Sequence, residues 1–305
     1  MSGQAERSDP RHQPVLPAEV LHFLEPSSGQ TIVDATVGAG GHARLIAERL
    51  GPLGRLIGLD QDMSMLQLAQ PRLVDLPVTL VQANFDQLPL VLEERGINAV
   101  NGVVADLGVC SDQIDCAERG FSFQQEGPLD MRLDPSQGEP ASALVKRLSE
   151  RTLADLFWNY GEERYSRRIA GKIVETRRRT PLETTGQLAE LVRSCVPRPR
   201  GQRHPIDPAT RVFQALRIAV NDELGALERF LVALPRCLKP GGKAVIISFH
   251  SLEDRRVKQA FRDRAVWKVL TPKPVQAGDE ELRNNPRARS AKLRAACLLE
   301  TRRDQ

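Results

Sequence analysis

The sequence predicts an α/β protein: a doubly wound, mostly parallel sheet with a helical insertion domain. Apolar strand-like segments alternate with helical ones from residue 31 to residue 107. This alternation stops near Gln113 and resumes after a segment rich in proline and glycine at 197–205. Since such alternation builds a parallel sheet with helices on both faces, we expect a sheet domain at 15–112 and 206–305. Residues 113–205 form the predicted insertion, and the polar residues 1–14 a disordered tail.

The first half of the sheet domain is predicted from runs of Val, Ile and Leu and from apolar residues at helical spacing. Strands are expected at 31–36, 56–60, 78–81 and 100–107. Helices are expected at 44–50, 63–73 and 88–94. Each of the first three strands is thus followed by a helix, as a parallel sheet requires.

The insertion contains no segment with the pattern of a strand. A loop rich in charge and glycine at 115–138 precedes helices expected at 141–148, 153–160, 165–178 and 185–196. The sheet domain resumes with a long helix at 210–234, a strand at 243–249 and a helix at 252–264. Two closing strands are expected at 267–270 and 290–299.

Composition places the chain among ordinary globular proteins, with 41% hydrophobic and 27% charged residues. No apolar run approaches the ~20 residues that span a bilayer, and the N-terminus lacks the apolar centre of a secretory signal. The five cysteines are scattered, without the paired spacing of a structural zinc site. We therefore expect a cytoplasmic protein with reduced thiols, no membrane span and no metal.

The net charge of +4 is unevenly distributed along the chain. Residues 1–110 hold 7 Arg and 13 Asp or Glu, whereas residues 111–305 hold 36 Lys or Arg and 26 Asp or Glu. A basic excess outside the first 110 residues suggests a polyanionic partner. Solvated helix faces would give the same counts, so charge alone leaves both interpretations open.

A glycine cluster follows the first predicted strand, in the sequence DATVGAGGH from Asp34. Glycines there let the backbone approach a ligand that lies over the strand ends. A dinucleotide-binding fingerprint wants a third glycine three residues after Gly40, and that position is Ala43. The acidic residue just before the turn, Asp34, is instead typical of methyltransferases.

Three further residues follow or end the predicted strands. Asp60 ends the second strand, where a carboxylate can accept hydrogen bonds from both ribose hydroxyls of a cofactor. Phe85 follows the third strand and can stack on an adenine, or simply pack in the core. Asp106 ends the fourth strand, at the methionine end of such a cofactor. Together these positions favour S-adenosylmethionine over NAD.

Longer motifs extend over nearly the whole chain. They are VDATVGAGGH from Val33, DLGVCSDQIDCAERGFSF from Asp106, GPLDMRLDP from Gly127, YGEERYSRRIA from Tyr160, DPATRVFQALRIAVNDEL from Asp207, ISFHSLEDRRVK from Ile247 and NPRARSAKLR from Asn285. With these motifs the chain closely resembles the small-subunit rRNA cytosine-N4 methyltransferases of the MraW, or methyltransferase H, type.

The resemblance implies a Rossmann-like methyltransferase sheet that is interrupted by a substrate-recognition insertion. It implies transfer of a methyl group from S-adenosylmethionine to the N4 amine of a cytidine in the decoding region of 16S rRNA, within a nearly assembled small subunit. The cofactor contacts that it implies are Gly40, Gly41, His42, Asp60, Phe85, Asp106 and Gln113. The chain departs from the family pattern at Cys110, Asp112 and Cys116, where Ser, Pro and Asp are usual.

Cytosine N4 is a poor nucleophile, so the protein must align it with the methyl group and offer acceptors to its N–H groups. DNA amino-methyltransferases use a Pro-Pro-aromatic motif for this, and the chain contains no Pro-Pro. We therefore expect no DNA substrate. Asp130 and His250 are the candidate catalytic acceptors. The alternatives are a salt bridge between Asp130 and Arg132 and a helix-entry role for His250.

Basic residues are concentrated in the insertion and near the C-terminus. Residues 163–211 hold 12 Arg or Lys against 5 Asp or Glu. The RNA-binding candidates are Arg167, Arg168, Arg177, Arg178, Arg179, Arg287 and Arg289. Phosphate contact is the functional interpretation, whereas Glu162 and Glu163 are expected to form helical ion pairs with Arg167. The alternative to an enzyme is a ribosome-assembly protein that binds RNA without catalysis.

Overall fold

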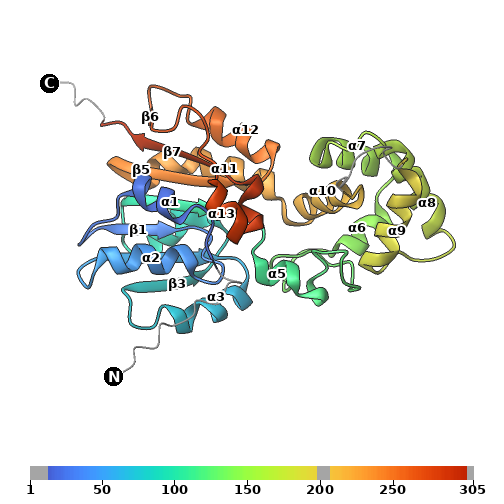
Figure 1. The fold of residues 1–305 in the computed structure, drawn as a ribbon, viewed down its shortest axis with the longest axis horizontal. Coiled ribbons are helices and arrows are strands. Elements are labelled where there is room, and N and C mark those ends of the chain that lie inside the picture. Colours follow the sequence, from blue (N-terminus) through green and yellow to red (C-terminus); the bar gives the residue numbers. More distant parts are fainter. Residues whose placement is uncertain (1–12, 198–206, 301–305) are drawn as a thin grey trace. The chain divides into compact units, whose positions relative to one another are not determined.

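The computed structural model describes residues 13–197 and 207–300 (Figure 1). The chain forms two compact units, one that combines Met1–Gly108 with Leu224–Gln305 and one that comprises Val109–Glu223. The second unit is therefore longer than the predicted insertion, because it includes the helix that follows residue 207. The predicted return segment at 197–205, apart from Pro197, and most of the predicted tail at 1–14 lie outside the described residues.

The first unit contains a seven-stranded sheet in the order β3-β2-β1-β4-β5-β7-β6. The first five strands in this order are parallel to one another, and β7 is antiparallel to both β5 and β6. This confirms the predicted doubly wound, mostly parallel sheet. Its strands are β1 (Thr31–Asp34), β2 (Arg55–Asp60), β3 (Val78–Gln82), β4 (Val100–Asp106), β5 (Leu238–Ser248), β6 (Trp267–Val269) and β7 (Lys292–Leu298).

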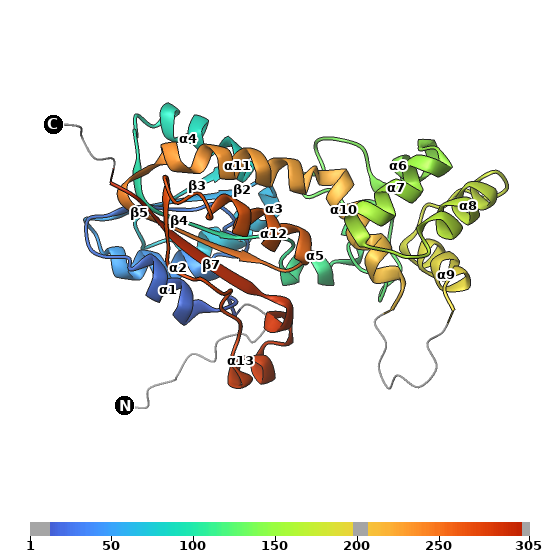
Figure 2. The ribbon, with the colours of Figure 1, turned by 90° about the horizontal axis from the view of Figure 1, so that it is seen from above.

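Helices cover both faces of this sheet (Figure 2). Successive strand residues alternate between the two hydrophobic cores: Ile32 belongs to one and Val33 to the other. One core includes α4 (Leu88–Glu94), α11 (Glu223–Cys237) and α12 (Ser251–Ala260). The other includes α1 (Pro17–Leu24), α2 (Gly41–Leu50), α3 (Met63–Ala69) and, partly buried, α13 (Asp279–Asn284). Strands buried on both faces explain the nearly continuous apolar runs in the sequence.

In the described residues of the second unit the regular elements are helices, joined by loops such as 120–140, and an isolated bridge links Pro128 to Thr184. Its core brings together Leu129, Met131 and the apolar faces of five helices. The helices of this unit are α5 (Ser111–Asp115), α6 (Ala141–Arg147), α7 (Glu150–Gly161), α8 (Ser166–Arg177), α9 (Thr185–Cys195) and α10 (Ala209–Asn221).

Some predicted helices are wrong in their extent; the one expected at 252–264, for example, ends at Ala260. The helix expected at 210–234 is two helices, α10 and α11, separated by Asp222 in a left-handed conformation (φ 49°). The helix expected at 63–73 ends at Ala69 and continues as a 3-10 turn, where Pro71 has no N–H to donate. The helices α1, α5 and α13 were not predicted. Among the described residues, no helix is long and apolar enough to cross a membrane.

Candidate functional site

The strand order places a topological switch point between β1 and β4. The chain runs from β1 outward to β3 on one side and from β4 outward on the other side. Ligands of such sheets bind outside the carboxyl ends of the strands at this point. The predicted residues Gly40, Gly41 and His42 follow β1, Asp60 ends β2, Phe85 follows β3 and Asp106 ends β4. The structure thus brings six of the seven predicted cofactor residues to one edge of the sheet.

The glycine loop after β1 is held close to the neighbouring strand. Gly38 and Gly40 adopt positive φ angles of 53° and 90°, which side chains disfavour. A Cβ at Gly58, in the middle of β2, would lie 2.5 Å from Cγ2 of Val37. Gly58 therefore lets the loop settle on β2, and α2 begins directly after the loop, at Gly41. This role of Gly58 was not predicted from the sequence.

Asp60 fixes the loop through both of its carboxylate oxygens. The backbone N–H of Gly38 donates to Oδ2 at 2.8 Å, and the N–H of Asp62 donates to Oδ1 at 2.9 Å. Burial raises the pKa of Asp60 to about 7, although both N–H donors lower it. A carboxylate anchored in this way has a fixed orientation, and its remaining lone pairs can accept from a ligand hydroxyl.

Three side chains at the switch point have buried polar atoms without a hydrogen-bond partner. Asp34 and His42 are buried, and His42 Nε2 lies 3.7 Å from Asp106 Oδ2. The unpartnered atoms are Oδ2 of Asp34, both ring nitrogens of His42 and Oδ1 of Asp106. Because buried polar groups are nearly always hydrogen-bonded in folded proteins, these four atoms mark a candidate ligand site.

The charges of this cluster are coupled. Burial raises the pKa of Asp34 to about 6, and the neighbouring His42 opposes this rise. Burial also lowers the pKa of His42, but Asp106 and Asp34 outweigh it, so the net pKa lies above the usual value. Two carboxylates that face one imidazole make the site suitable for a cationic ligand group.

Thr36 joins the loop to β4. Its hydroxyl oxygen accepts the backbone N–H of Asp106 at 2.6 Å, and its own N–H donates to Oδ1 of Asp34 at 3.2 Å. Thr36 lies inside the glycine motif but was not among the predicted site residues. Its contact with Asp106 joins residues 70 apart in the sequence, so it depends on tertiary packing and could not be predicted from the motif.

Phe85 begins a 3-10 turn after β3 and is partly buried. Its ring packs edge-on against Phe230 of α11, with 5.4 Å between the ring centres. An ion pair between the adjacent Asp86 and Arg229, at 2.8 Å, connects the same two segments. Core packing therefore explains why the side chain of Phe85 is partly buried, and its stacking role stays a prediction.

Gln113 and Asp130 belong to the second unit. Gln113 is buried in α5, and its Oε1 accepts the N–H of Cys110 at 2.9 Å. Asp130 forms the predicted salt bridge, in which Nε and Nη2 of Arg132 donate to its two oxygens at 2.9 and 2.7 Å. Although burial raises the pKa of Asp130, the hydrogen bonds from Arg132 outweigh it and the net pKa is low. The cofactor contact of Gln113 and the catalytic role of Asp130 stay predictions.

His250 caps the N-terminus of α12, as the helix-entry interpretation states. Its Nδ1 accepts the N–H of Glu253 at 3.4 Å, and Oε2 of Glu253 accepts the N–H groups of Phe249 and His250. The two residues thus form a reciprocal capping box. This contact explains the local fold, and a catalytic role for His250 stays a prediction.

The RNA-binding candidates differ in their surroundings. Arg177 is half-buried, and its Nη1 donates to the carbonyls of Val145 and Leu148 at 2.6 and 2.7 Å. Arg287 is also half-buried. The candidates with exposed side chains are Arg167, Arg168, Arg178, Arg179 and Arg289.

The predicted ion pair between Glu163 and Arg167 is wrong. Glu163 is buried and lies 3.9 Å from Arg211 of α10. Its backbone packs in the tight turn between α7 and α8, which directs the carboxylate towards the core rather than along α8. Arg167 is therefore left exposed.

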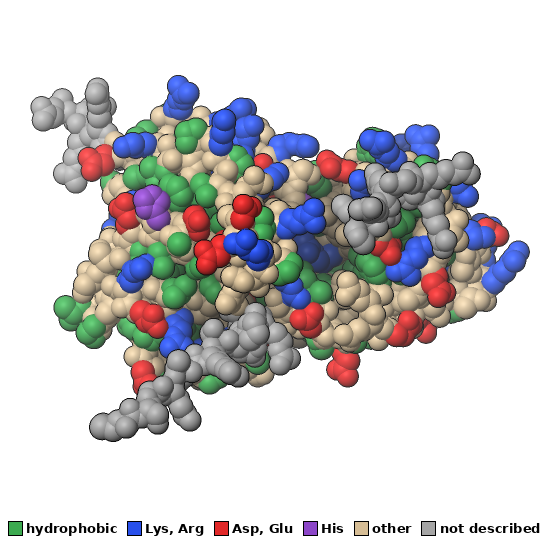
Figure 3. All heavy atoms as spheres, viewed as in Figure 1, with side chains coloured by type: hydrophobic (Ala, Val, Ile, Leu, Met, Phe, Trp, Pro, Cys, Tyr) green, Lys and Arg blue, Asp and Glu red, His purple; other side chains and the backbone are tan. Residues whose placement is uncertain are grey.

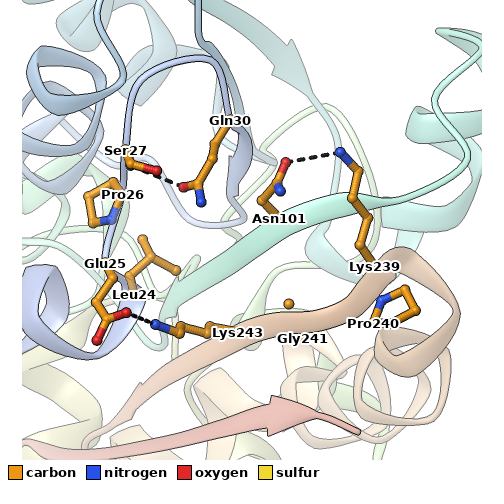
Figure 4. Close-up of a pocket in the computed structure, with 11 residues that line it drawn as sticks. Leu24, Glu25, Pro26, Ser27, Gln30, Asn101, Lys239, Pro240, Gly241 and Lys243 are labelled. Carbon is orange, nitrogen blue, oxygen red and sulfur yellow. Dashed lines mark hydrogen bonds and ion pairs between the residues drawn. The ribbon is translucent and has the colours of Figure 1, made fainter. Parts of the chain in front are cut away.

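A separate pocket of about 570 Å³ lies at the opposite edge of the sheet (Figure 4). It is lined by the end of α1, the start of β4 and the irregular start of β5. Lys243 pairs there with Glu25, and Lys239 donates to Asn101. Since this pocket is at the amino ends of β4 and β5, it is distinct from the switch-point site.

Comparisons with known proteins agree with this arrangement. The model of the MraW methylase family matches residues 9–298. The chain is 50% identical to "Ribosomal RNA small subunit methyltransferase H" of Geotalea uraniireducens, with 95% of this chain and 99% of that protein covered. It is 51% identical to the protein of the same name from Sorangium cellulosum, with 94% and 90% covered. The chain belongs to the MraW methylase family.

Proposed function

We propose that this chain uses S-adenosylmethionine to methylate the N4 amine of a cytidine in the decoding region of 16S rRNA, within the small ribosomal subunit. The observation that carries the proposal is the set of unpartnered buried atoms on Asp34, His42 and Asp106 at the switch point. Membership of the MraW methylase family and the printed name of its relatives support RNA as the substrate.

The residues at the switch point fit this cofactor. Its ammonium and sulfonium groups are cationic, and Asp34 and Asp106 offer unpartnered carboxylate oxygens. Its ribose has two hydroxyl donors, and Asp60 presents a carboxylate that two backbone N–H groups orient. The cofactor supplies an electrophilic methyl group on a good leaving group. Gly40, Gly41, His42, Phe85 and Gln113 are the further contacts that we propose.

The remaining task of the protein is to align cytosine N4 and to accept hydrogen bonds from its N–H groups. Alignment contributes a large part of such accelerations. Asp130 is ionised at neutral pH because its pKa is low, so it can accept a hydrogen bond without acting as a strong base. Asp130 and His250 are the acceptors that we propose.

Transfer of a radiolabelled methyl group to isolated small subunits tests the proposal. We expect label in 16S rRNA, more in assembled subunits than in naked RNA, and none in DNA of the same sequence. Asp106→Ala is the matched inactive variant. Binding of the subunit without any transfer would contradict an enzymatic role and would favour the assembly protein instead.

The pKa of Asp60 predicts how binding depends on pH. Ribose hydroxyls donate to the ionised carboxylate of Asp60. Since the pKa of this group is about 7, the carboxylate of the free protein becomes increasingly protonated as the pH falls below that value. We expect the affinity for methylthioadenosine to fall about tenfold for each pH unit below this value. This ligand carries the ribose and adenine but no methionine charges, so Asp34 and His42 do not contribute.

Calorimetry between pH 5.5 and 8 measures this dependence. Asp60→Asn removes the titrating group and should give a nearly flat profile. The same slope in both proteins would show that Asp60 does not contact the ribose.

A further inference from the structure

Two exposed aromatic side chains lie on the helical hairpin of α7 and α8. Trp158 is 57% exposed and Tyr165 is 39% exposed. They are the only large hydrophobic residues among the described part of the second unit that are exposed to this degree. The chain has two Trp and two Tyr in all, and its other tryptophan, Trp267, is buried. Because the chain contains few aromatic residues, two that are exposed on one hairpin suggest a binding surface.

The turn between these helices is tightly held. Glu162 adopts a left-handed conformation, and the N–H of the buried Glu163 donates to the carbonyl of Phe157. Oε1 of Glu163 accepts the N–H of Tyr165 at 2.8 Å. A Cβ at Gly161 would lie 2.5 Å from the carbonyl oxygen of Arg211, so this turn also packs closely on α10. The backbone that carries Tyr165 is therefore fixed before any ligand arrives.

The same turn carries uncompensated positive charge. Arg164, Arg167 and Arg168 are exposed, and none of them forms an ion pair with the described residues. The buried carboxylate of this turn, Glu163, is directed towards Arg211. Figure 3 shows Lys and Arg side chains at the surface over α7 and α8. A partner of opposite charge, with flat groups to cover the aromatic rings, fits this surface.

We propose that the α7–α8 turn binds an unpaired segment of RNA, with bases stacked on Trp158 and on Tyr165 and phosphates on Arg164, Arg167 and Arg168. Single-stranded RNA combines these two features, because its bases are free to stack on aromatic side chains and its backbone is polyanionic. A paired segment would offer phosphates alone. The proposal rests on the proposed function, since it takes RNA as the substrate, and it adds where and in which form the RNA is held.

Fluorescence of Trp158 tests the stacking directly. In a Trp267→Phe variant of the full chain, Trp158 is the only tryptophan, and a stacked base quenches its emission. We expect a 12-nucleotide single-stranded RNA to quench Trp158 and a duplex of the same sequence to leave its emission unchanged. Equal quenching by both, or by neither, would overturn the proposal. If the Trp267→Phe variant does not fold, the RNA affinities of the Tyr165→Ala and Trp158→Ala variants, made in the wild-type protein, test the proposal instead.

Tyr165→Ala and Trp158→Ala separate stacking from charge. We expect the substitution with the larger effect to weaken single-stranded RNA binding roughly fivefold or more, without changing the salt dependence of binding. Tyr165→Phe should retain binding, and Val232→Ala, which removes an exposed apolar residue of α11, serves as the control. Gln at Arg164, Arg167 and Arg168 should flatten the log-affinity versus log-salt slope by up to roughly two units.

Other outcomes identify which statement fails. Unchanged RNA affinity in both alanine variants, together with loss of binding to a ribosomal protein, would make the turn a protein interface and overturn the proposal. If the protein methylates the subunit but Trp158 of the Trp267→Phe variant is not quenched, the stacking proposal fails and the proposed function stands. If Trp158 is quenched but no methyl group is transferred, RNA binding stands and the proposed function fails.

Discussion

Replacing Asp60 with Ala is expected to weaken S-adenosylmethionine binding by roughly 10- to 150-fold. Hydrogen bonds to a charged acceptor contribute about 1.5–3 kcal/mol, which corresponds to this range of affinity. The variant also removes the acceptor for the N–H groups of Gly38 and Asp62. The loop after β1 then loses its anchor to β2, which adds to the loss of the ribose contact.

Calorimetry on the purified variants measures this effect. Asp75→Ala is the matched control, because Asp75 is an exposed aspartate of the same unit outside the switch point. Asp60→Asn should lie between wild type and Asp60→Ala, since an amide oxygen can still accept one of the two N–H groups. Wild-type affinity in a folded Asp60→Ala protein would refute the ribose assignment.

Replacing Arg178 and Arg179 with Gln is expected to flatten the salt dependence of subunit binding. Both side chains are exposed, and neither forms an ion pair with the described residues. Each phosphate contact contributes about 0.9 to the log-affinity versus log-salt slope on a duplex and about 0.7 on a single strand. The double variant should therefore lose up to roughly 1.8 units of slope, and cofactor affinity should stay unchanged.

The control for this experiment is Gln at Arg44 and Arg49. These residues are exposed on α2 of the first unit, and their replacement changes the net charge of the protein by the same amount. Arg177 is left in place because its Nη1 holds the carbonyls of Val145 and Leu148, so its loss would perturb the fold of the second unit. An unchanged slope in the double variant would move the search for phosphate contacts to Arg287 and Arg289.

Much of the sheet could be predicted from the sequence because its strands are buried on both faces. Runs such as Leu56–Leu59 are apolar at every position, and a glycine or an acidic residue follows where the chain leaves the sheet. The break between α10 and α11 could not be predicted in this way, because apolar residues continue at helical spacing through Asp222. The short helix α13 buries no residue fully and so leaves no clear periodic pattern.

The edge of the sheet where the cofactor is proposed to bind could also be predicted, because strand ends in a parallel sheet meet at one edge. Hydrogen-bond partners that depend on tertiary packing could not be predicted from the sequence. The sequence does not reveal that Arg177 is committed to two backbone carbonyls, or that Thr36 joins the glycine loop to Asp106. Both contacts connect segments that are about 30 or more residues apart.

The identity of the modified nucleoside is the most direct test of the central claim. Small subunits that lack the modification are incubated with the protein and methyl-labelled S-adenosylmethionine, and the 16S rRNA is digested to nucleosides for mass spectrometry. The proposed function predicts that the label appears in N4-methylcytidine and that Asp106→Ala abolishes it. Label in 5-methylcytidine, or in a methylated adenosine or guanosine, would contradict it.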